Sequence, residues 1–137
     1  MPARPTLVTV HPSRIPALAL VADLVAVVVF AAVGRVSHAD AGSLTGLAGT
    51  ALPFLVGAGA AWATPRVRAE PVSVRAGLVV LVLTAGVGFL LRWAFLGRLP
   101  LSFAVVTVIV LAVLLVGWRG VSATVARMRA PRETSRG

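Results

Sequence analysis

Four long apolar segments dominate the sequence and restrict what the chain can fold into. They cover residues 15–33, 44–63, 74–96 and 101–121. A helix needs about 20 residues to cross a hydrocarbon core about 30 Å thick, and each segment is close to that length. Because lipid offers no partners to backbone N–H and C=O groups, and no segment alternates polar with apolar residues, all four are predicted to be helices. Charged residues make up only 12% of the chain, too few to cover a water-exposed surface.

Short polar segments separate the four runs. Glycine, proline and charged residues are concentrated in residues 34–42, 65–71 and 97–100, where a helix is expected to end. A serine, which can accept a hydrogen bond from an unpaired backbone N–H, lies at or near the start of each run: Ser13, Ser43, Ser73 and Ser102. We therefore predict an all-α fold, a four-transmembrane-helix antiparallel bundle, with an N-terminal tail over 1–14 and a basic C-terminal tail over 122–137.

The basic residues predict an orientation. All thirteen are arginines. Alternate crossings place most of them on the side of the two tails: Arg4, Arg14, Arg66, Arg68, Arg75, Arg119, Arg127, Arg129, Arg132 and Arg136. The other side holds Arg35, Arg92 and Arg98. Since arginine is enriched on the cytoplasmic side, both termini are predicted to be cytoplasmic in a multi-pass protein of the inner (cytoplasmic) cell membrane.

The net charge of +9 bears on partners. The arginines lie beside apolar runs, and no basic face is interleaved with aromatic residues. We therefore expect the lipid bilayer as the partner, with anionic lipid at the basic C-terminal tail, and no nucleic acid. A simpler alternative is that the tail only fixes the topology.

One segment allows a different reading of the first run. Residues 39–41, Ala-Asp-Ala, resemble a signal-peptidase site, and cleavage there would leave three helices. The first run is longer than the usual hydrophobic region of a signal peptide and contains Asp23. An uncleaved helix is therefore the main expectation.

Asp23 is the most informative residue for function. It lies eight residues into the first run, about 12 Å of helix rise from its start, where a carboxylate costs about 2.5–3.5 kcal/mol. Thr50, Pro53 and Thr84 are expected at similar depth, and Pro53 frees a backbone carbonyl within its helix. We predict an intramembrane polar site of Asp23, Thr50, Pro53 and Thr84. It would serve either as a proton or cation site or as a structural contact between helices.

A second candidate site lies on the opposite side of the membrane. Arg92 continues a stripe of small residues on the third run, so its side chain is expected to face the bundle. With Arg35, His38 and Arg98 it could form a basic mouth that binds an anion. The alternative is that these arginines extend separately toward the membrane surface.

Motifs of enzymes and cofactor sites are missing from the sequence. It has no cysteine, no Gly-rich phosphate loop and no serine elbow. His38 and Asp40 offer two metal ligands at most, too few for zinc. Trp62, Trp93 and Trp118 lie at the ends of runs, as membrane-anchoring aromatic residues do. We expect no enzyme activity, no cofactor and no metal.

Several short motifs resemble an uncharacterised family of actinobacterial type, catalogued as domain of unknown function 3054. They span about residues 15–119: Asp23, Phe30, Gly34-Arg35, His38, Pro53-Phe54, Gly57, Trp62, Leu91-Arg92, Phe103 and Gly117-Trp118-Arg119. The resemblance implies a multi-pass membrane protein and no activity, cofactor or catalytic residue.

The function classes that remain differ in the role they give Asp23. The main expectation is a non-catalytic subunit, assembly factor or structural component of a membrane complex, with other membrane subunits as partners. The alternative is a small homo-oligomeric transporter or channel that uses Asp23 and the arginines of the opposite side. A membrane enzyme is the least expected class, since no acid–base pair or nucleophile is visible.

Overall fold

The computed structural model describes residues 14–36 and 42–131, and this part of the chain is all-α without any strand. Its helices are α1 (Ile15–Val36), α2 (Leu44–Ala63), α3 (Pro65–Ala69), α4 (Val74–Leu96), α5 (Leu101–Leu111), the π-helix η1 (Ala112–Val116) and α6 (Gly117–Arg129). The last three follow one another without a break and form one long helix. The predicted four-helix fold is therefore confirmed.

Local signals explain several helix ends. The Ser43 hydroxyl accepts from the backbone N–H of Gly46 at 3.2 Å, and that of Ser73 accepts from Ala76 at 3.0 Å. Both serines are N-caps, as the sequence predicts. At the other end of α4, Gly97 adopts a left-handed conformation with φ of 68°, which glycine tolerates best. Of the other two serines, Ser102 lies inside α5, which begins after Pro100, and Ser13 lies outside the described residues.

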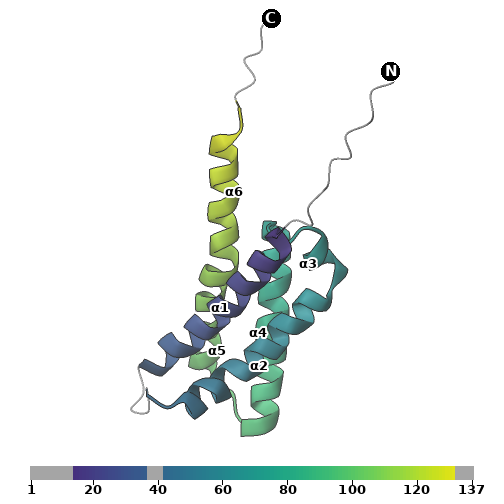
Figure 1. Ribbon diagram of the computed structural model, residues 1–137. Coiled ribbons are helices and arrows are strands. Elements are labelled where there is room, and N and C mark those ends of the chain that lie inside the picture. The colour runs from purple at the N-terminus through teal and green to yellow at the C-terminus, as the bar shows by residue number, and fades with distance from the viewer. Residues whose placement is uncertain (1–13, 37–41, 132–137) are drawn as a thin grey trace, which may run out of the picture.

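Two helices extend beyond the runs seen in the sequence. α1 continues to Val36, and α6 continues to Arg129 through residues assigned above to the C-terminal tail. No proline or glycine interrupts residues 121–130, so nothing stops the helix before Pro131. Arg127 and Arg129 in its last turn interact favourably with the helix dipole. Figure 1 shows α6 extending well beyond the other helices.

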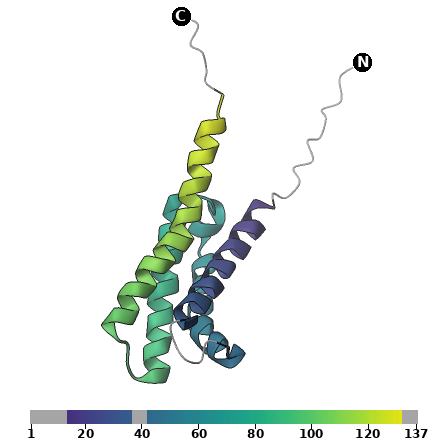
Figure 2. The ribbon, with the colours of Figure 1, turned by 90° about the vertical axis from the view of Figure 1, so that its left-hand side faces the viewer.

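The long helices alternate in direction (Figures 1 and 2). The start of α1, the short helix α3 and the end of α6 lie toward one end, which we name the terminal end. The α4–α5 connection, the last turns of α1 and the first turns of α2 lie at the opposite end. Short connections between consecutive helices produce this antiparallel arrangement.

The closest helix pair is α2 and α4. A Cβ atom on Gly57 would lie 2.7 Å from the Thr84 carbonyl oxygen and 2.8 Å from that of Leu83. The two backbones are therefore in direct contact at this crossing, which only a residue without a side chain permits. Close approach through small residues is the usual way helices associate in lipid.

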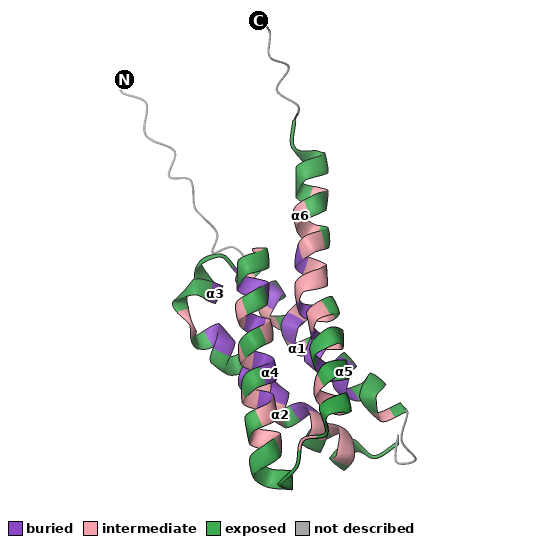
Figure 3. Cartoon of the chain, turned by 180° about the vertical axis from the view of Figure 1, so that it is seen from behind, coloured by how far each residue is buried: buried purple, intermediate pink, exposed green. Residues whose placement is uncertain are grey.

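All four long helices have the length and apolar character to cross a membrane. Their outward faces are apolar, as the exposed residues Val25, Leu52, Val82 and Ile109 illustrate. Buried residues lie on the faces that meet other helices (Figure 3). Over its most apolar 18 residues, the 101–129 helix has the smallest buried share, 17% against 28–33% for the other three. The chain is a multi-pass membrane protein.

Each long helix contributes one phenylalanine to an aromatic cluster: Phe30 from α1, Phe54 from α2, Phe89 from α4 and Phe103 from α5. The fully buried ring of Phe54 is central, with ring centroids 5.1 to 6.4 Å from those of the other three. Most of these pairs meet edge to face, the arrangement that aromatic quadrupoles favour. Gly88 makes the room, since its Cα lies directly against the Phe54 ring.

Candidate functional site

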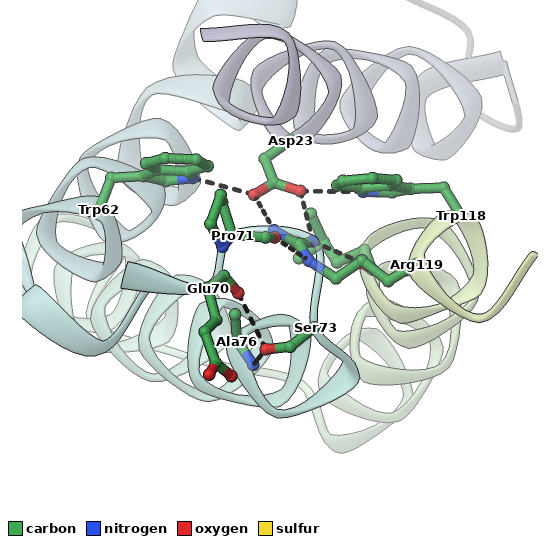
Figure 4. Close-up of polar contacts among 9 residues, drawn as sticks. Asp23, Trp62, Glu70, Pro71, Ser73, Ala76, Trp118 and Arg119 are labelled. Atoms are coloured by element: carbon green, nitrogen blue, oxygen red, sulfur yellow. Dashed lines mark hydrogen bonds and ion pairs between the residues drawn. The ribbon is translucent and has the colours of Figure 1, made fainter. Parts of the chain in front are cut away.

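Asp23 lies at the centre of a buried set of hydrogen bonds in the terminal half of the bundle (Figure 4). Its Oδ1 accepts from Arg119 Nη1 at 2.7 Å and from Trp118 Nε1 at 3.1 Å. Its Oδ2 accepts from Arg119 Nη2 at 2.7 Å and from Trp62 Nε1 at 2.9 Å. We name these residues, Asp23, Trp62, Trp118 and Arg119, the polar cluster.

Arg119 is as fully buried as Asp23, with no exposed side-chain surface on either residue. Besides its two-pronged contact with the carboxylate, its Nε donates to the Pro71 carbonyl at 2.9 Å. Its Nη1 also donates to the Leu115 carbonyl at 2.7 Å. The guanidinium carbon lies 4.4 Å from the centre of the Trp118 ring. The cation is therefore neutralised by Asp23, and two further N–H groups donate to backbone oxygens, as a buried charge requires.

The π-helix η1 positions Arg119. Buried residues of this long helix follow a spacing of four: Thr107, Leu111, Leu115 and Arg119. In an ideal α-helix each step of four residues rotates the side chain by about 40° around the helix axis. Over the three steps from Thr107 to Arg119 the rotation is about 120°, which would turn Arg119 away from the core. The wider turns of η1 offset the rotation, so that Arg119 still faces the bundle.

Gly77 on α4 provides the space for the arginine side chain. A Cβ atom at this position would lie 2.7 Å from Arg119 Cδ. The polar cluster thus depends on α1, α2, α6, the connection before α4 and a glycine of α4. Its ion pair joins Asp23 in the first long helix to Arg119 in the fourth, 96 positions later in the sequence.

The arrangement is closed to further ligands. A carboxylate offers about four acceptor positions, and four N–H donors occupy those of Asp23. With its charge balanced by Arg119 and no exposed surface, the carboxylate has no open acceptor position for a further donor.

The expected partners of Asp23 are not its partners in the structure. Thr50 donates to the Gly46 carbonyl of its own helix at 3.1 Å. Thr84 is buried at the α2–α4 crossing, and its hydroxyl has no hydrogen-bond partner among the described residues. Pro53 is half-buried and lines a groove at the opposite half of the bundle. Trp62 reaches Asp23 from the end of α2, whereas Pro53 and Thr50 lie nine and twelve residues earlier on that helix, about 13 and 18 Å of helix rise away, so these residues do not share the depth of Asp23.

The four residues of the predicted anion site are not brought into one contact by the structure. The Arg35 guanidinium packs on Gly46 between α1 and α2. Arg92 stacks on the Phe103 ring, with the guanidinium carbon 4.4 Å from the ring centre. Arg98 is exposed after the end of α4, and His38 lies outside the described residues. Only Arg92 lines a groove.

Arg119 is the functional residue that the sequence reasoning missed. Sequence position groups Arg119 with the arginines that orient the chain and predicts Trp62 and Trp118 at the membrane surface. The assignment of these two tryptophans is wrong, because both indoles donate to Asp23, whereas Trp93 is exposed. The signal that could have found Arg119 is its place inside an apolar run near the same end of the bundle as Asp23. An arginine there needs an anion as much as an aspartate needs a cation.

A groove of about 360 Å³ separates α2 from α4 in the opposite half of the bundle. Its walls are Gly49, Leu52, Pro53 and Val56 on α2 and Leu91, Arg92, Phe95 and Leu96 on α4. Arg92 is its one charged wall residue. In the described ranges, no three His, Asp or Glu side chains come together as a possible metal site.

Comparison with known proteins gives one match. The family described as "Protein of unknown function (DUF3054)" matches residues 20–122, which include every residue of the polar cluster. No match was found among curated proteins or among solved structures.

Proposed function

We propose, for a chain that belongs to the DUF3054 family of proteins of unknown function, a non-catalytic role as a subunit or assembly component of a membrane complex. The observation that carries this proposal is the closed state of the polar cluster. The intramembrane carboxylate that could have served transport is instead saturated by four donors and paired with a buried arginine.

Burial of such a pair favours a structural role over a transporting one. A transport carboxylate must exchange its partners with solvent or substrate during a cycle, and here four separate contacts would have to break at once. A fixed, hydrogen-bonded ion pair instead specifies which helix faces meet, which is the best-attested use of buried ionic groups. The supported role is therefore to hold a defined membrane-embedded shape.

The surface offered to other subunits includes α6. From Ala126 to Pro131 all side chains are exposed, and they include Arg127, Met128 and Arg129. This segment extends past the other helices (Figure 2) and presents both charge and an apolar side chain. We propose that it contacts a partner subunit or the anionic membrane surface beside one.

The proposed location is the cytoplasmic membrane with both termini cytoplasmic, supported by the excess of arginine at the terminal end. The chain has no cysteine, so single cysteines can be introduced without a background. Ser122→Cys should react with a membrane-impermeant maleimide only after lysis, and Gly42→Cys should react in intact cells. The reverse pattern would overturn this orientation.

The role in a complex is tested by purifying the tagged protein from its own membrane in a mild detergent, with identification and native mass of the product. A partner present in a fixed ratio supports the proposal. Its loss on removal of residues 126–137, with the bundle still folded, would assign the contact to α6. A homo-oligomer that passes ions or solutes when reconstituted, and loses this activity in Asp23→Asn, would refute the proposal and favour a transporter.

A further inference from the structure

The groove between α2 and α4 has the form of a lipid site. The two helices touch at Gly57. Toward the end of the bundle away from the termini, an open space lies between residues 49–56 of α2 and residues 91–96 of α4. Gly49 is open to this space, since a Cβ atom there would meet nothing within 4 Å. Leu52, Val56 and Phe95 are exposed along its walls and supply an apolar lining.

Arg92 adds a positive charge to this apolar groove. The described acidic residues are Asp23, which is bound to Arg119, and Glu70, which lies at the terminal end. Arg92 therefore has no carboxylate partner in the part of the chain that the structure describes. One face of its guanidinium stacks on Phe103, and stacking leaves the N–H edges available to a planar pair of oxygens.

The height of Arg92 in the membrane indicates the chemical class of the anion. It lies four residues before the end of α4, about 6 Å of helix rise, and it is followed by the exposed Trp93. This is the level at which tryptophans meet lipid headgroups. A phosphate at this depth would be within reach of Arg92, while an attached acyl chain would run inward beside Leu52 and Val56.

We propose that this groove binds one anionic phospholipid, with its phosphate on Arg92 and an acyl chain between α2 and α4. Charge complementarity selects this occupant: an apolar chain alone would leave the arginine unpaired in lipid, which is costly. A phosphodiester also offers the two oxygens that match a guanidinium fork.

The test compares two lipids with the same acyl chains, anionic phosphatidylglycerol and zwitterionic phosphatidylcholine. Each is added to delipidated protein in a neutral detergent, and bound lipid is counted by native mass spectrometry while thermal unfolding is followed in parallel. We expect one phosphatidylglycerol to be retained in preference to phosphatidylcholine and to raise the melting temperature. Inorganic phosphate alone should do neither, because it cannot fill the apolar part of the groove.

Matched variants distinguish lipid binding in the groove from general attraction of anionic lipid to exposed arginines. Arg92→Gln should weaken phosphatidylglycerol binding by about tenfold, the value of one charge-assisted contact, whereas Arg98→Gln removes an exposed arginine and should leave it unchanged. Gly49→Leu fills the groove and should reduce binding, while Gly86→Leu, at an exposed open position on α4 away from the groove walls, should not.

Three outcomes would overturn the proposal. They are equal retention of the two lipids, equal effects of Arg92→Gln and Arg98→Gln, and a dimer that Gly49→Leu dissociates. The dimer would identify a second copy of the chain as the occupant. If Arg92→Gln fails to fold, the two glycine variants decide: phosphatidylglycerol binding lost in Gly49→Leu and kept in Gly86→Leu supports the groove, and any other pattern contradicts it.

Discussion

The polar cluster and the aromatic cluster connect the same helices by different means. Both take side chains from α1, α2 and the long C-terminal helix, and on α1 their members Asp23 and Phe30 are about 10 Å apart in helix rise. The polar cluster relies on four donors that converge on one carboxylate. The aromatic cluster relies on ring contacts that tolerate a range of distances and angles.

The difference matters because water does not drive helices together inside a membrane. Apolar packing against a neighbouring helix gains little over packing against lipid, so it holds helices weakly and with little discrimination. The attraction within a buried ion pair roughly offsets the cost of removing both charges from water. Loss of one partner, however, leaves a charge in a medium that cannot solvate it. We therefore expect the polar cluster to determine which helix faces meet, and the aromatic cluster to fill the space that results.

The largest expected effect comes from breaking the ion pair. Asp23→Asn or Arg119→Gln alone should lower the free energy of unfolding by about 3–5 kcal/mol, because each leaves a buried charge without its counter-ion. The double variant should be less destabilised than the sum of the two. Thermal unfolding of all four proteins in detergent measures this coupling. Additive effects would mean that the two side chains do not act as a pair.

A smaller effect is expected at the helix crossing that lies between the clusters. Gly57→Ala places a methyl group against the α4 backbone, which cannot rotate away, and should cost about 1–3 kcal/mol. Gly59→Ala is the control, since its Cβ would meet nothing within 4 Å. The same assay should find that variant as stable as the parent or slightly more so. Equal losses in both variants would refute a direct backbone contact.

The aromatic cluster should be more forgiving than the polar one. Phe54→Leu keeps most of the buried volume but loses the edge-to-face contacts of the central ring, for a cost of about 1–1.5 kcal/mol. Tryptophan fluorescence should change little, because Trp62 and Trp118 lie in the polar cluster and Trp93 is exposed. A loss as large as that of Asp23→Asn would remove the distinction between the two clusters.

The smallest effect is expected at Thr107. Its hydroxyl is buried without a hydrogen-bond partner in the described ranges, so the group contributes desolvation cost and no compensating bond. Thr107→Val should leave the free energy of unfolding within about 1 kcal/mol of the parent, or raise it. A clear loss of stability in thermal unfolding would indicate a partner for this hydroxyl.

Much of the fold could be predicted from the sequence because membrane helices follow simple rules. Apolar length gives the number of helices, and serine caps such as Ser43 and Ser73 give their starts. The requirement that Asp23 have a partner could also be predicted, since an isolated carboxylate in lipid is too costly.

The identity of that partner could not be predicted by the same rules. The ends of the apolar runs give depth too coarsely to separate Asp23 from Thr50 and Pro53, and pairing also depends on the direction in which each helix face points. For Arg119 that direction depends on the π-helix at Ala112–Val116, which changes the angular register of everything after it. A helical projection from Leu101 that assumes uniform α-geometry turns Arg119 away from Asp23.

The ion pair joins the first long helix to the last, and this has a consequence for how the protein is made. Asp23 enters the membrane early in synthesis, while Arg119, 96 residues later, is still inside the ribosome or not yet translated. Until α6 is in place, the aspartate lacks the counter-ion that it has in the folded structure, and an unpaired carboxylate in lipid is costly. Closure of the pair therefore requires all four long helices, and a product that ends before Arg119 lacks the counter-ion of Asp23.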